Sequence, residues 1–153
     1  MRPRFQVVAA AAEVPSETLD VEARILDEVG AELLDRRGEP LDAIRDDLAA
    51  ADAILTEALG RDRFDAARIA QLDRCRVISV YAAGADGVDA AAASARGIVV
   101  ANVPGYCTVD VAEHAVALLL AAWRKLPRAE RHVRAGGWGL EPLRPVRRLA
   151  GST

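Results

Sequence analysis

The sequence predicts an α/β fold built around a parallel sheet of five strands, and three observations carry this prediction. Between residues 5 and 101, short apolar runs alternate with longer segments whose apolar residues recur at helical spacing. Each longer segment has about the ten residues that a helical crossover between parallel strands requires. Apolar residues make up 52% of the 153 residues and aromatic residues only 4%, so small aliphatic side chains must fill the core.

The five predicted strands are short apolar runs that begin near the N-terminus and end at Ala101. They cover residues 5–9, 32–34, 53–55, 77–81 and 98–101. A helical segment separates each run from the next, so the strands are joined by βαβ crossovers. Such crossovers place helices on both faces of a parallel sheet, and we expect that arrangement here.

Four helices are predicted between these strands, over residues 18–29, 40–48, 63–72 and 88–96. Their apolar residues fall roughly along one helical face, as with Leu41, Ile44 and Leu48 of the second helix. Gly30 and Gly97 follow the first and the last of these helices. Glycine commonly ends a helix at that position, so both residues support the predicted boundaries.

The pattern changes after Asn102. A turn over Val103–Tyr106 precedes a long predicted helix over residues 109–126, with Thr108 as its N-cap. The stretch Ala115–Trp123 is apolar on every face, which is typical of a helix that is buried on all sides. Because the preceding sheet can cover only one side, we expect this helix to need further partner surface, or to remain poorly packed without it.

Composition and charge exclude several classes of function. No apolar run approaches the roughly 18 residues of a membrane span, and residues 1–4 lead directly into a predicted strand rather than a signal peptide, so we expect a cytoplasmic protein. Residues 102–153 carry 8 basic and 4 acidic residues, but these are scattered and lack interleaved aromatic residues, which disfavours nucleic-acid binding. Cys75 and Cys107 do not have metal-ligand spacing, and we expect no metal site.

The richest candidate site is the segment Tyr81–Asp89, which follows the fourth predicted strand. Ligands of open parallel sheets bind beyond the carboxyl ends of the strands. The small side chains of this segment would let an anion approach the main chain, where successive N–H groups form an anion-binding nest. Asp86 or Asp89 would cap the next helix. An ordinary turn between a strand and a helix is the alternative interpretation.

Three longer stretches of the sequence, taken together, are more specific. Val77–Asp89, Arg96–Cys107 and Val111–Leu120 occur in this order and closely resemble the D-isomer-specific 2-hydroxyacid dehydrogenases. The resemblance implies a flavodoxin-like substrate domain in residues 1–101. It implies that residues 102–153 hold a helix that crosses between domains, followed by the start of a truncated Rossmann cofactor domain.

The resemblance also implies an activity and its residues. Members of the family oxidise D-2-hydroxy acids, or reduce 2-oxo acids, with NAD. The substrate carboxylate would be held by the loop of Tyr81, Ala82, Ala83 and Gly84, and NAD would approach Ala83 and Val111. The family's G-x-G-x-x-G fingerprint and its catalytic arginine, glutamate and histidine would lie beyond residue 153. The chain therefore resembles the N-terminal portion of a dehydrogenase, with no catalytic residue of its own and no activity alone.

The sequence departs from the family pattern at two positions, of which the first bears on the conformation of the loop and the second on the expected substrate. Ala82 stands where the family loop commonly has glycine. Val80 stands where many members have an arginine that meets an acidic group of the substrate or its carboxylate. The missing arginine makes a phosphorylated substrate a weaker expectation. His114 matches a scaffold position of the crossing helix and not the catalytic histidine.

Other functions are compatible with parts of the pattern. A non-catalytic, corepressor-like module that senses NAD(H) would share the same fold. A phosphoacceptor receiver domain would share the βα alternation, but it needs acidic residues after the first strand, an aspartate after the third and a lysine after the fifth. This sequence has Ala10–Ala12, Thr56–Glu57 and Asn102–Val103 there, so that alternative fails. We expect a homodimer that forms through the crossing helix.

Overall fold

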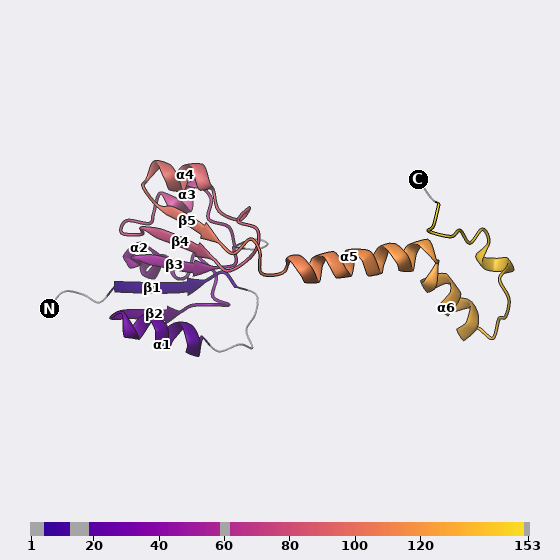
Figure 1. The fold of residues 1–153 in the computed structure, drawn as a ribbon. Coiled ribbons are helices and arrows are strands. Elements are labelled where there is room, and N and C mark those ends of the chain that lie inside the picture. Colours follow the sequence, from indigo (N-terminus) through magenta and orange to yellow (C-terminus); the bar gives the residue numbers. More distant parts are fainter. Residues whose placement is uncertain (1–4, 13–18, 59–61, 152–153) are drawn as a thin grey trace. The chain divides into compact units, whose positions relative to one another are not determined.

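The computed structural model of the chain describes residues 5–12, 19–58 and 62–151. Residues 1–4 and Thr18, the predicted start of the first helix, lie outside these ranges. The chain divides into two compact units, Met1–Tyr106 and Cys107–Thr153. The first unit is an α/β fold, which confirms the predicted fold class, and the second consists of helices and turns (Figure 1).

The sheet of the first unit has five parallel strands in the order β2-β1-β3-β4-β5. This is the strand order of flavodoxin-like folds. All five predicted strands are confirmed, with bounds that differ by one or two residues: β1 Phe5–Ala10, β2 Ala31–Asp35, β3 Ala53–Thr56, β4 Val77–Val80 and β5 Val99–Asn102. The register places Val80 of β4 beside Asn102 of β5.

The helices of the first unit are shorter than predicted: α1 Asp20–Glu28, α2 Arg45–Ala50, α3 Ala66–Ile69 and α4 Ala90–Ala95. Caps explain two of these bounds. The carboxylate of Asp65 accepts from the N–H of Arg68, and that of Asp89 accepts from the N–H of Ala92. Because an N-cap residue has non-helical dihedral angles, neither helix can begin earlier.

Glycines end two of these helices as predicted. Gly30 follows α1 with a φ of +76°, and Gly97 follows α4 with a φ of +72°. Few residues other than glycine adopt this left-handed conformation without strain. Both glycines therefore mark the turn from a helix back into the sheet.

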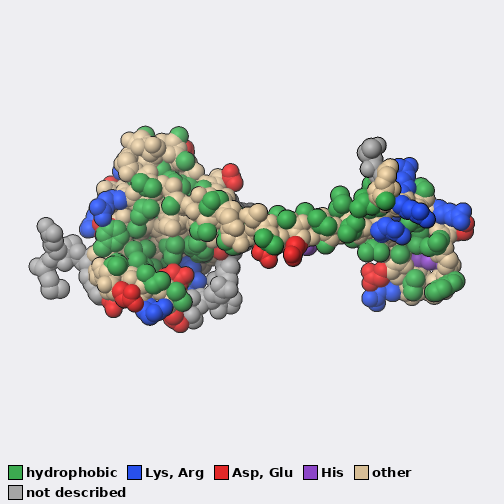
Figure 2. All heavy atoms as spheres, in the orientation of Figure 1, with side chains coloured by type: hydrophobic (Ala, Val, Ile, Leu, Met, Phe, Trp, Pro, Cys, Tyr) green, Lys and Arg blue, Asp and Glu red, His purple; other side chains and the backbone are tan. Residues whose placement is uncertain are grey.

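The core lies on the two faces of the sheet. On one face, Val8, Ile54, Ile78 and Val80 of the strands pack with apolar side chains of the segments that hold α2, α3 and α4. On the other face, the cluster around Val7, Ala31 and Ala53 receives Leu26 of α1. This second face is covered less completely than predicted, since Val99 of β5 is 61% exposed. Figure 2 shows apolar side chains over part of the sheet.

The second unit contains α5 Thr108–Trp123, α6 Leu126–Arg134 and a short 3-10 helix at Glu141–Leu143. The predicted N-cap at Thr108 is wrong, because Cys107 occupies that position and Thr108 is the first helical residue. The predicted helix over 109–126 is also interrupted. Lys125 adopts a left-handed φ of 55°, which ends the α5 segment, and Pro127 lies in the first turn of α6, where a proline is well tolerated.

Helix α5 does not have the buried surroundings that its composition favours. No residue of α5 or α6 is buried, and Val116, Leu118 and Leu119 are each more than half exposed. Two hydrogen bonds tie the C-terminal segment to this region: the Trp123 indole donates to the Arg147 carbonyl, and the Lys125 ammonium donates to the Leu143 carbonyl. Within the described residues, no helix combines the length and the apolarity that a membrane crossing requires.

Candidate functional site

The candidate loop starts where β4 ends. The N–H of Tyr81 still donates to the Thr56 carbonyl of β3, at 3.0 Å, so the first residue of the loop continues the hydrogen bonding of the sheet. From Ala82 onward the chain leaves the sheet. The structure thus brings Tyr81, Ala82, Ala83 and Gly84 together at the carboxyl edge, in the first unit.

The carbonyl groups of this loop are fixed by the end of β5. The N–H of Val103 donates to the Ala82 carbonyl at 3.0 Å, and the Asn102 side-chain amide donates to the Ala83 carbonyl at 2.8 Å. These two bonds orient two successive peptide groups of the loop. The Asn102 side chain was not among the predicted site residues.

The N–H groups of the same loop are left without partners. Those of Ala82, Ala83 and Gly84 have no acceptor within the part of the chain that the structure describes. Gly84 is exposed, and Ala82 and Ala83 are half-buried. Because an N–H group that makes no protein hydrogen bond must find another acceptor, this row of donors is suited to an anion.

The second half of the loop is held from the other side. Phe64 forms an isolated bridge with Val88: its N–H donates to the Gly87 carbonyl at 2.8 Å, and its carbonyl accepts from the N–H of Asp89 at 2.9 Å. A Cβ built on Gly87 would overlap the carbonyl oxygen of Ala58. Glycine is therefore required here, because the loop passes directly against the segment after β3.

A hollow of about 320 Å³ adjoins the loop. Its small lining residues are Ala58, Ala82, Gly84 and Gly87, and its charged lining residues are Glu57, Arg63 and Asp86. The Arg63 guanidinium donates to the Asp86 carbonyl at 2.9 Å. Volumes of a few hundred Å³ are typical of sites for small molecules.

Tyr81 supplies a neutral phenol at this edge. Burial raises its pKa to about 12, and the negative charge of Glu57 acts in the same direction. The phenol therefore stays protonated at neutral pH, so it can donate a hydrogen bond but cannot act as a base.

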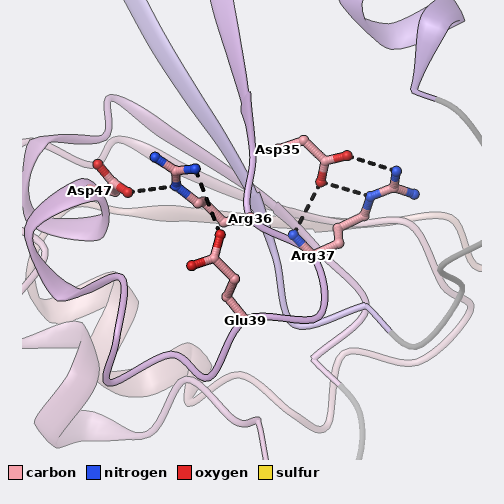
Figure 3. Close-up of polar contacts among 5 residues, drawn as sticks. All are labelled: Asp35, Arg36, Arg37, Glu39 and Asp47. Atoms are coloured by element: carbon pink, nitrogen blue, oxygen red, sulfur yellow. Dashed lines mark hydrogen bonds and ion pairs between the residues drawn. The ribbon is translucent and has the colours of Figure 1, made fainter.

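Ion pairs lie at the carboxyl end of β2, at the same edge of the parallel sheet as the candidate loop (Figure 3). Arg37 donates through two nitrogens to the two carboxylate oxygens of Asp35, at 2.9 and 2.8 Å, and this hydrogen bonding lowers the pKa of Asp35. Arg36 donates to Asp47 at 2.7 Å and lies 3.6 Å from Glu39. These two arginines are engaged by carboxylates. Arg63 differs from them, since it forms no ion pair among the described residues.

The remaining predicted residues are placed as follows. Val111 lies at the start of α5, in the second unit, and is 60% exposed. Its contact with NAD remains a prediction. His114 is exposed on the same helix. Cys75 is buried, which raises the pKa of its thiol. No cluster of three metal-ligating side chains occurs in the described parts of the chain.

Comparisons with known proteins point to one family. The family model described as "D-isomer specific 2-hydroxyacid dehydrogenase, catalytic domain" matches residues 11–153. The glyoxylate reductase of Aeropyrum pernix is 35% identical over 138 residues, which cover 90% of this chain and 39% of that protein. The D-3-phosphoglycerate dehydrogenase of Archaeoglobus fulgidus is 46% identical over 76 residues, which cover 50% of this chain and 14% of that protein.

A solved structure agrees with these relatives. The NAD-dependent formate dehydrogenase from Staphylococcus aureus, in complex with NAD, is 28% identical, with a TM-score of 0.70. The similarity covers 88% of this chain and 43% of that one. The chain thus spans less than half the length of the proteins it matches.

Proposed function

Because the chain belongs to the D-isomer-specific 2-hydroxyacid dehydrogenase family, we propose that it is the N-terminal part of an NAD-linked oxidoreductase. The reaction is oxidation of the CH–OH group of a D-2-hydroxy acid, or reduction of the corresponding 2-oxo acid. The observation that carries this proposal is the row of unpaired N–H groups at Ala82, Ala83 and Gly84. We propose that the anion they bind is the carboxylate of the substrate, and the family match supports this choice.

In this proposal the loop orients the substrate. The N–H groups of Ala82–Gly84 form charge-assisted hydrogen bonds with the two carboxylate oxygens, which fixes the direction of the C1–C2 bond. The Tyr81 phenol stays protonated beside the loop and remains a donor. The bonds from Val103 and Asn102 to the loop carbonyls keep the donors in place, so little ordering is needed on binding.

Hydride transfer requires parts that residues 5–151 do not supply. NAD, when bound, would accept the hydride from C2 of the hydroxy acid. The side chains of Ala83 and Val111, the two residues that the resemblance assigns to NAD, are small and apolar, and no G-x-G-x-x-G occurs in the 153 residues. We therefore propose that this chain alone binds NAD weakly and is inactive, and that the fingerprint and the proton-transferring groups follow in a longer polypeptide.

The cellular location and the oligomeric state of the protein are part of the same proposal. We propose that the protein works in the cytoplasm and dimerises through α5, whose apolar side chains lack cover. A non-catalytic, corepressor-like module that senses NAD(H) is the alternative, since it would have the same substrate-type fold. The sequence that follows Thr153 discriminates between them, because only the enzyme needs the catalytic arginine and histidine.

The direct test is a titration of the 15N-labelled chain with D-lactate, followed by NMR. The amide signals of Ala82, Ala83 and Gly84 should shift in a saturable way. The Gly97 amide, which donates to the Ser94 carbonyl, serves as an internal reference and should not move. Unchanged signals for Ala82–Gly84 at tens of millimolar D-lactate would contradict the proposed site.

Cofactor dependence is tested separately by calorimetric titration with NADH. We expect no micromolar binding by the 153-residue chain. The same chain extended through the rest of its reading frame should bind NADH and oxidise it in the presence of 2-oxo acids. Micromolar binding to the 153-residue chain would mean that the cofactor site is already complete in it.

A further inference from the structure

The hollow beside the candidate loop is lined by charged as well as small residues, which bears on the part of the substrate beyond its carboxylate. Ala82 and Gly84 belong both to the loop and to the lining of the hollow. An acid that binds the loop on the side of the hollow has its remaining carbons close to these lining residues. The groups there include a guanidinium at Arg63 and carboxylates at Glu57 and Asp86. An alkyl chain would leave these polar groups without new partners.

Arg63 is the donor of this set. One of its nitrogens donates to the Asp86 carbonyl, which links the guanidinium to the second half of the Tyr81–Asp89 segment. No carboxylate lies within ion-pair distance of Arg63 among the described residues. A guanidinium has five N–H donors, so Arg63 retains donors for a ligand while one of its nitrogens bonds to the Asp86 carbonyl.

The charges of the hollow restrict the ligand. A second carboxylate on the substrate would meet Arg63, but it would also face Glu57 and Asp86. An ammonium group would suit the two carboxylates and be repelled by Arg63. Hydroxyl groups satisfy both kinds of neighbour, because each hydroxyl donates one hydrogen bond and accepts others. The small walls at Ala58 and Gly87 leave room for a chain of carbons that carries them.

We propose that this hollow binds the hydroxyl groups on C3 and C4 of the substrate, so that the substrate is a polyhydroxylated 2-hydroxy acid, an aldonic acid of at least four carbons. Arg63 donates to a hydroxyl oxygen, and Glu57 and Asp86 accept from hydroxyl groups. This inference rests on the proposed function, which places the carboxylate at Ala82–Gly84. It adds Arg63 as a specificity-determining residue.

The test compares two D-2-hydroxy acids with the same number of carbons. D-Erythronate carries hydroxyls on C3 and C4, and D-2-hydroxybutyrate carries none there. Both are titrated by NMR into the 153-residue chain, with the amides of Ala82–Gly84 and the side-chain Nε–H of Arg63 as reporters. We expect both acids to shift the amides. D-Erythronate should bind about tenfold more tightly and should alone shift the Arg63 signal, as one or two added hydrogen bonds predict.

Two variants test whether Arg63 is responsible for the preference for D-erythronate. Arg63→Met keeps much of the side-chain length but removes the donors, and it should abolish the preference for D-erythronate. Arg45→Gln makes the same change of charge on α2, outside the hollow, and should keep the preference. Urea unfolding of both variants checks that the fold is retained. If Arg63→Met unfolds, Arg63→Lys replaces it. The lysine keeps the charge and should keep part of the preference.

The outcomes discriminate between this inference and the proposed function. If neither acid shifts the amides of Ala82–Gly84, the proposed function fails. If both acids shift them with equal affinity, or if the preference survives in Arg63→Met, the proposed function stands and this inference is overturned. Tighter binding of D-malate than of D-erythronate would also overturn it, since a second carboxylate would then be the favoured group.

Discussion

In the first unit Phe64, Ile54 and Ile78 have no exposed surface, whereas in the second unit Val116, Leu118 and Leu119 are more than half exposed. Both regions are rich in aliphatic residues, so composition alone does not separate them. The first unit arranges its apolar residues on a sheet that helices cover, and its candidate site lies at the edge of that sheet. The second unit has two helices and a short C-terminal segment, in which Leu143 is the buried hydrophobic residue among those described. From this difference we expect the first unit to fold on its own and the second to need a partner surface.

The largest expected effect is on the free energy of unfolding, when a large aliphatic side chain is truncated to alanine in each unit. Ile54→Ala removes a fully buried side chain and should lower the free energy of unfolding by about 2–5 kcal/mol. Leu119→Ala removes a side chain that is 54% exposed and should change it by less than about 0.5 kcal/mol. Urea unfolding at low protein concentration measures both. Similar losses would show that α5 has a core in the monomer.

The next largest effect on stability is expected at Gly87, where the candidate loop packs against the Ala58 carbonyl. Gly87→Ala places a Cβ against the Ala58 carbonyl, so the loop or the segment after β3 must move. We expect a loss of about 1–3 kcal/mol, as for other overpacked sites. Gly105→Ala is the matched control, because a Cβ there meets nothing within 4 Å. Equal stabilities of the two variants would show that the loop is not held as tightly as the structure indicates.

A smaller effect on stability and binding is expected at Asn102, whose side chain bonds to the candidate loop. Asn102→Ala removes the hydrogen bond to the Ala83 carbonyl and should cost about 1 kcal/mol of stability or less. It should also weaken D-lactate binding by about threefold, because the N–H groups of the loop lose part of their orientation. Gln71→Ala, at an exposed residue after α3 that does not belong to the loop, serves as the control. Unchanged binding by Asn102→Ala would limit Asn102 to a structural role.

The smallest expected effect is a pH dependence at the end of β2. The hydrogen bond from Arg37 lowers the pKa of Asp35 below 3.8 in the folded chain. Its stabilisation is therefore present above pH 3.8 and is lost as the pH falls through the lower, folded value. Since the Asp35 side chain is 48% exposed, solvent screens the pair, and Asp35→Asn should cost no more than about 0.5 kcal/mol at pH 7.

Thermal unfolding of this variant between pH 2 and pH 7 is the measurement. The difference from the unmodified chain should shrink toward the acid end of the range. Glu32→Gln, on the same strand, makes the same change of charge and is the matched control. A difference for Asp35→Asn that grows as the pH falls would have the wrong sign for this ion pair.

The strands were predictable because continuous apolar runs depend only on local sequence, and all five appear in the sheet. The sequence predicts helices that are too long where an apolar residue belongs to the loop before the helix. Phe64 looks like part of a helical face, but its main chain pairs with Gly87 and Asp89 instead. The α5 helix was predicted to extend to Leu126, because the left-handed conformation of Lys125 has no signal in the residue type.

The candidate loop was predictable as a unit, but its supports were not. Tyr81–Gly84 lie together because they are consecutive and follow a strand. Asn102 reaches Ala83 only because β5 pairs with β4 in the observed register, and periodicity does not fix that register. A polar residue at the end of an otherwise apolar strand was the available signal. Arg63 lines the hollow because the neighbouring Phe64 pairs with Val88, and the sequence pattern did not indicate that pairing.

The most direct test of the contrast between the two units is hydrogen exchange of the 153-residue chain, followed by mass spectrometry at several protein concentrations, with light scattering on the same samples. We predict strong, concentration-independent protection of β1, β3 and β4. We predict that α5 is weakly protected in the monomer and gains protection only as the chain associates. A monodisperse monomer with strong protection across residues 108–123 would contradict this, because it would show that α5 is fully packed within the single chain.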